Sequence, residues 1–122
     1  MLVDAERAGS TVDEVVADDD DLAIAAITAA ELLVGVELAS KEHRERRLEF
    51  AERILASVPV ELYDLAVARA HASLLAYTRR AGEPRGAHDL VIAATAVATD
   101  RTVVSADPQA FERLPGLRVR LV

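Results

Sequence analysis

The sequence contains no cysteine and no tryptophan, and it has only two tyrosines, two phenylalanines and four prolines among 122 residues. The lack of cysteine excludes disulfide bonds and thiolate metal sites. The scarcity of aromatic residues leaves no visible platform for stacking nucleic-acid bases. No apolar run approaches the ~20 residues that a membrane span needs, and no basic-then-apolar secretory segment opens the chain. A cytoplasmic protein is therefore the simplest interpretation.

Positive charge is also scarce. The formal net charge is −7 and the isoelectric point is near 4.9, which argues against a protein that coats nucleic acid by bulk electrostatics. Lys41 is the only lysine, and the arginines cluster in residues 44–53 and 79–85. We interpret these clusters as solvated helix faces, with contact to phosphate groups as the alternative.

Hydrophobic residues make up 52% of the chain, so that a core of Ala, Val, Leu and Ile is available for one domain of this length. Apolar periodicity and turn residues predict strands at 22–27, 59–63, 102–106 and 117–122, and helices at 28–40, 42–58, 64–81 and 89–100. Strands separated by helices favour an α/β fold, in which a parallel sheet is sandwiched between helices.

The first twenty-one residues do not supply an opening strand in this interpretation. The segment MLVDAERAG is interpreted as a helix stub that ends at Gly9. A short helix with a capping pattern from Thr11 to Glu14 follows, and then an acidic turn at residues 18–21. Because a strand precedes each helical layer elsewhere, the pattern predicts that the first strand is missing upstream of Met1.

Three acidic residues have local structural explanations. Glu31 completes a capping box with Thr28, Asp89 begins a helix, and Asp107 precedes Pro108 as an N-cap. All three, however, follow a strand or loop onto a helix N-terminus, at the carboxyl edge of the sheet where ligands collect. Two carboxylates ~5 Å apart repel by roughly 3 kcal/mol at an effective dielectric constant near 20, whereas one N-cap contributes only ~1 kcal/mol.

If these acids converge, a cation must therefore offset their repulsion. Oxygen-only ligands select a hard ion such as Mg²⁺ or Mn²⁺, which suits attack on a phosphodiester. Among the histidines, His88 lies beside Asp89, whereas His43 and His71 are interpreted as surface or core-edge residues. The sequence lacks an EF-hand pattern, a Gly-rich phosphate loop and a G-x-S-x-G motif. The absence of a lysine near the C-terminal strands argues against a phosphoacceptor receiver domain.

Two stretches of the sequence, TAAELLVGVELA and GAHDLVIAATAVATDRTVVSADPQAFERLPGLRV, resemble the PIN domains of VapC-type toxins. They carry the patterns E-L-x-x-G, D-x-x-I-A-A-x-A and S-x-D-x-x-x-F in that order. The resemblance implies a parallel sheet covered by helices and a divalent-metal-dependent endoribonuclease. It also implies that Glu31, Asp89 and Asp107 are the second, third and fourth catalytic, metal-binding acids, with Ser105 supporting the last one.

The start of the chain departs from this family, whose first strand normally ends in D-[TS]-S. Asp4 is interpreted as a solvated helix residue and a poor substitute for the first acid. We therefore expect residues 1–122 to form a single PIN-like domain that is truncated at its N-terminus.

The resemblance implies the toxin of a toxin–antitoxin pair that cleaves structured RNA such as tRNA or rRNA loops. It further implies a VapB-type antitoxin as partner and a homodimer. The alternative is a catalytically inactive PIN-like remnant that serves as an antitoxin-binding or dimerisation module.

Overall fold

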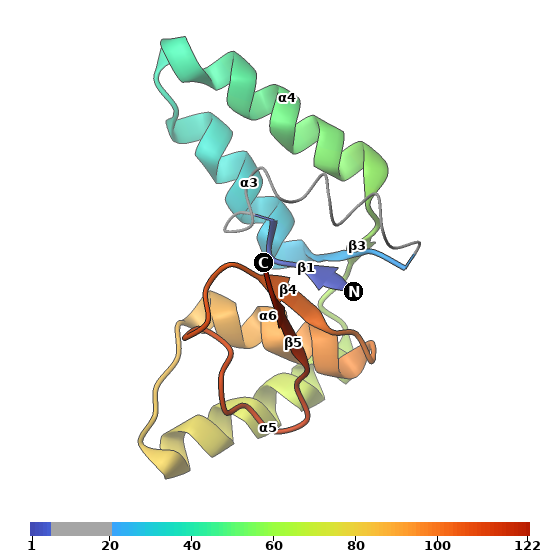
Figure 1. Ribbon diagram of the computed structural model, residues 1–122, viewed down its shortest axis with the longest axis vertical. Coiled ribbons are helices and arrows are strands. Elements are labelled where there is room, and N and C mark those ends of the chain that lie inside the picture. Colours follow the sequence, from blue (N-terminus) through green and yellow to red (C-terminus); the bar gives the residue numbers. More distant parts are fainter. Residues whose placement is uncertain (6–20) are drawn as a thin grey trace.

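The computed structural model describes residues 1–5 and 21–122. The predictions at Gly9 and from Thr11 to Glu14, and the acidic turn before Asp21, lie outside this part of the chain. In chain order the elements are β1 (Leu2–Val3), β2 (Ile24–Ala25), α3 (Ala26–Leu38), α4 (Lys41–Ser57), β3 (Val60–Glu61), α5 (Leu65–Ala81), α6 (Ala87–Ala98), β4 (Val103–Ser105) and β5 (Val119–Leu121) (Figure 1).

The strands pair in parallel, in the orders β1–β4–β5 and β2–β3. A parallel bridge between Leu2 and Ala23 joins β1 to the chain just before β2. The carboxyl ends of β1, β2 and β4 therefore lie at one edge of the sheet. This arrangement confirms the predicted α/β fold class, and it brings the residues that follow Val3, Ala25 and Ser105 to a common edge.

The first strand, which the sequence pattern placed upstream of Met1, is present, and that prediction is wrong. Leu2 donates its backbone N–H to the Thr102 carbonyl at 2.8 Å, and Val3 donates to the Ala23 carbonyl at 2.9 Å. The strand is thus hydrogen-bonded on both sides. A strand of two residues shows no alternation that a sequence pattern can detect. Its extended conformation depends on its two neighbours, which lie far away in the sequence.

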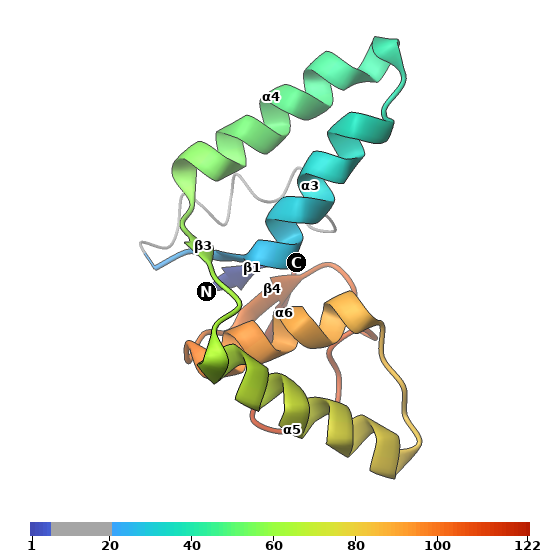
Figure 2. The same cartoon turned by 180° about the vertical axis from the view of Figure 1, so that it is seen from behind.

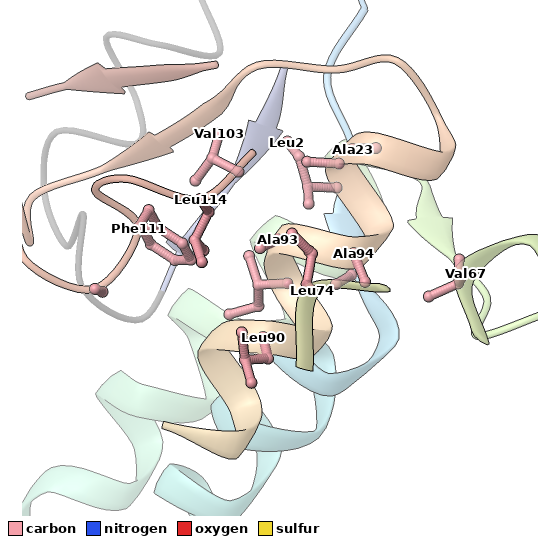
Figure 3. Close-up of a cluster of buried hydrophobic side chains, with 14 residues drawn as sticks. Leu2, Ala23, Val67, Leu74, Leu90, Ala93, Ala94, Val103, Phe111 and Leu114 are labelled. Atoms are coloured by element: carbon pink, nitrogen blue, oxygen red, sulfur yellow. The ribbon is translucent and has the colours of Figure 1, made fainter. Parts of the chain in front are cut away.

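The helices cover the two faces of the sheet (Figures 1 and 2). Helices α3 and α4 lie on one face, and α5 and α6 lie on the other. Side chains on each strand alternate between these faces. Leu2 and Val103 accordingly join the buried cluster on the α6 side, with Phe111 (Figure 3), whereas Val3 and Val104 join the cluster beneath α3 and α4. Two apolar cores therefore hold β1 and β4 from both faces.

The predicted N-terminal cap forms in α5 but not in α3. The predicted start of α5 is confirmed, because the side chain of Asp64 accepts the Val67 N–H at 3.0 Å. The prediction of a capping box between Thr28 and Glu31 is wrong. Helix α3 begins earlier, and its N-cap residue is Ala25, which makes no side-chain hydrogen bond. Strand β2 leads directly into α3, so that Thr28 is already buried inside the first turn.

Arg101 links the segment before β4 to two other parts of the chain. Its guanidinium donates to Glu61 at 2.6 Å and to Asp21 at 3.1 Å, while the side chain is 15% exposed. Burial by itself lowers the pKa of Arg101, but the hydrogen bonds to Glu61 and Asp21 outweigh it and raise the pKa. Arg101 therefore stays charged and fastens β4 to β3.

Candidate active site at the carboxyl edge of the sheet

Ser105, at the end of β4, connects two acidic residues at the carboxyl edge. Its hydroxyl donates to Asp4 Oδ2 at 2.9 Å and accepts the backbone N–H of Asp107 at 3.1 Å. The contact follows from the parallel register, because Val3 pairs with Val104 and the next residue on each strand is Asp4 or Ser105. A fully buried hydroxyl thus fixes one carboxylate oxygen of Asp4 and the start of the loop that carries Asp107.

Asp4 is not the solvated helix residue that the sequence suggested. It lies directly after β1 and only 2% of its surface is exposed. Burial of a carboxylate is costly unless the carboxylate is hydrogen-bonded or paired with a cation. Asp4 therefore occupies the position, after the first strand, where the sequence pattern had found no acid.

Asp107 lies at the carboxyl edge of the sheet, two residues after β4, and its side chain makes capping contacts. Its Oδ1 atom accepts the N–H groups of Gln109 at 2.9 Å and Ala110 at 3.3 Å. The expected N-cap geometry is therefore present, although residues 108–114 form turns rather than a turn of helix. The Asp107 backbone N–H donates to the same Ser105 hydroxyl that binds Asp4, and this contact ties the start of the loop to the end of β4.

Glu31 and Asp89 lie where α3 meets the start of α6. Glu31 Oε1 is 2.7 Å from His88 Nδ1, and the side chains are 20% and 61% exposed respectively. Asp89 is in the first turn of α6, and its carboxylate turns back over Gly86, the N-cap residue of that helix. The pair Glu31–His88 thus ties α3 to the N-terminus of α6 beside Asp89.

The described acids at this edge do not form one compact cluster. Within residues 1–5 and 21–122, no three acidic or histidine side chains converge closely enough to form a ready-made metal site. The donor chemistry fits a hard divalent cation, because every acidic donor is a carboxylate oxygen and one of these carboxylates, Asp4, is buried. The roles of Glu31, Asp89, Asp107 and Ser105 as site residues stay predictions.

The fold and this edge together define an α/β protein with a carboxylate site at the carboxyl ends of parallel strands. Residues 1–117 match the PIN domain, and the chain belongs to the PIN-domain family. No helix among the described residues is long and apolar enough to cross a membrane.

Several proteins similar to this chain are toxins or toxin–antitoxin complexes. The chain is 33% identical over 98 residues to the tRNA(fMet)-specific endonuclease VapC of Salmonella typhimurium, which covers 80% of this chain and 73% of that protein. The DNA-bound VapBC structure from Salmonella typhimurium matches 98% of this chain and 95% of its own, with 27% identity and a TM-score of 0.85. VapBC-5 from Mycobacterium tuberculosis matches 99% of this chain and 97% of its own, also with 27% identity and a TM-score of 0.85.

These similarities confirm the sequence-based prediction of a PIN-domain nuclease of the VapC toxin type, and they do not favour the alternative of an inactive remnant. Sequence reasoning missed two features of the site. For Asp4 the sequence signal is the apolar run before it in MLVD, which is too short to distinguish a strand from the start of a helix. The contact of His88 with Glu31 had no sequence signal, since these residues are far apart in the chain.

Proposed function

We propose that this protein is a divalent-metal-dependent endoribonuclease that cleaves tRNA, with Asp4, Glu31, Asp89 and Asp107 as its acidic site residues. The observation that carries the proposal is the buried contact of Asp4 with Ser105, which lies two residues before Asp107. A tRNA substrate is supported by the name of the 33% identical relative, a tRNA(fMet)-specific endonuclease. An rRNA loop is the alternative substrate in the same class of structured RNA.

The chain's own residues would position the reacting groups. Ser105 holds Asp4 Oδ2 from within the protein, so that the carboxylate keeps one orientation. The two backbone N–H groups at Asp107 Oδ1 fix the second carboxylate in the same way. His88 orients Glu31 from the solvent side. When bound at these carboxylates, Mg²⁺ or Mn²⁺ would stabilise negative charge on the phosphodiester and make a water molecule more acidic.

The same comparisons support a proposal for the protein partner. We propose a VapB-type antitoxin as the binding partner, supported by the VapBC complexes among the structural neighbours. Exposed apolar residues outside the core, such as Leu62 and Leu65, offer contact area for the antitoxin and for a second copy of the chain in a homodimer. The cytoplasm, where tRNA is found, is the proposed location.

The test of the proposal is cleavage of initiator tRNA by the purified protein, with Mg²⁺ or Mn²⁺ and with EDTA. Asp4→Asn keeps an acceptor for the Ser105 hydroxyl but removes the negative charge, and we expect cleavage to fall by roughly 100-fold or more. Asp64→Asn is the matched control, because Asn caps α5 about as well as Asp and the residue lies outside the site. Undiminished cleavage in EDTA, or equal loss of cleavage in both variants, would contradict the proposal.

A further inference from the structure

A cleft between α3 and α4 adjoins the candidate active site. Its volume is about 570 Å³, and its lining includes Glu31, Gly35, His43, Arg47 and His88. Clefts that hold small molecules or single building blocks of a polymer have volumes of about 300–1,000 Å³. Glu31 is thus both a site acid and one wall of a space large enough for a nucleotide.

Arg47 is the cation of this cleft. Its Nη1 atom lies 3.4 Å from where a Cβ would stand at position 35, so that the glycine lets the guanidinium rest against α3. Gly35 and Glu31 are four residues apart and therefore share one face of α3. Within the part of the chain that the structure describes, Arg47 makes no ion pair, whereas its neighbour Arg44 pairs with Glu37 at 3.7 Å.

The apolar side chains that α3 contributes to the lining suggest what the cleft binds. Val34 and Leu38 line it and are exposed to solvent. A nucleotide has a phosphate that suits a guanidinium and a base and ribose that pack on apolar side chains. The net charge of −7 repels RNA from the protein as a whole, so that binding requires an unpaired cation at the site.

We propose that this cleft is a nucleotide subsite of the nuclease, in which Arg47 contacts the phosphate of an RNA nucleotide next to the scissile phosphodiester. The inference rests on the proposed function. RNA is continuous, and Glu31 borders both the reacting site and the cleft, so that a phosphodiester at Glu31 brings its neighbouring nucleotide to Arg47. Val34 and Leu38 contact the base or ribose of that nucleotide.

The test measures RNA binding without cleavage. The probe is a fluorescently labelled tRNA anticodon stem–loop, titrated in EDTA at several salt concentrations with wild-type, Arg47→Gln and Arg46→Gln protein. Arg46 is the matched control, because it is the adjacent exposed arginine of α4, is absent from the cleft lining and loses the same charge.

We expect Arg47→Gln to weaken RNA binding about 10-fold, as for loss of one charge-assisted hydrogen bond. The slope of log K against log salt should fall by about 0.7, which corresponds to one phosphate contact on a single strand. Arg46→Gln should change the dissociation constant less than about twofold. In cleavage assays, Arg47→Gln should raise KM more than it lowers kcat.

Equal RNA affinity for the two arginine variants would overturn the inference and leave the cleft to a protein partner. That outcome is distinguishable from failure of the proposed function, because the wild type would still cleave RNA with Mg²⁺ while Asp4→Asn would not. A wild type that neither binds nor cleaves tRNA would overturn both.

Discussion

Ser105→Ala tests whether the hydroxyl between Asp4 and Asp107 organises the carboxyl edge. The substitution removes a hydrogen bond to a carboxylate, which contributes about 1.5–3 kcal/mol when the acceptor is charged. It also leaves the half-buried N–H of Asp107 without the hydroxyl oxygen that accepts its hydrogen bond at 3.1 Å, and this loss costs about 1 kcal/mol. Because Ser105 is fully buried, water cannot replace the lost group without rearrangement.

The expected loss of stability is therefore about 2–4 kcal/mol in total. For a chain of this length each kcal/mol corresponds to about 3–6 °C, so that the melting temperature should fall by roughly 6–24 °C. Urea unfolding should give the free energy of unfolding, and a thermal melt with EDTA or magnesium should show a smaller magnesium-dependent increase than in the wild type. Cleavage measured well below the melting temperature should also decrease.

Ser105→Thr provides the control for this experiment. It keeps the hydroxyl, and its β-branched side chain suits a strand, although the added methyl group in a filled core costs about 1 kcal/mol or more. The threonine variant should retain the magnesium response that the alanine variant loses. If the free energy of unfolding of Ser105→Ala is within about 0.5 kcal/mol of the wild-type value, the hydroxyl does not anchor Asp4.

Three further predictions concern single residues. Asp107→Asn should change the free energy of unfolding in EDTA by no more than ~0.5 kcal/mol, because Asn still accepts the two backbone N–H groups. It should nevertheless abolish the rise in melting temperature that magnesium causes in the wild type. If the variant keeps that rise, Asp107 has only a capping role. Arg101→Gln should lower the free energy of unfolding by about 1–3 kcal/mol without changing cleavage by the folded protein, and urea titration with a cleavage assay checks both; unchanged stability would contradict the link to Glu61. Gly82→Ala should cost about 1 kcal/mol in the same titration, since φ is +65° at the end of α5, and a stabilised variant would count against this account.

The four long helices α3 to α6, their order and the family are predictable from the sequence. The predicted helix at 64–81 and the strand at 102–106 correspond to α5 with its Asp64 cap and to β4, because long amphipathic segments and caps are local signals. The patterns E-L-x-x-G, D-x-x-I-A-A-x-A and S-x-D-x-x-x-F are equally local, and they were sufficient to identify Glu31, Asp89 and Asp107 as candidates.

The conformation of Leu2 and Val3 and the burial of Asp4 depend on contacts with distant parts of the chain. Two apolar residues are too few to show a period, and MLVDAERAG has the composition of a helix start. Pairing of β1 with β4 on one side and with Ala23 on the other fixes the extended backbone. Ser105, about a hundred residues away in the chain, then gives the buried Asp4 carboxylate its hydrogen bond. Contacts between such distant segments leave no local periodicity, and for this reason the first acid had to be found in three dimensions.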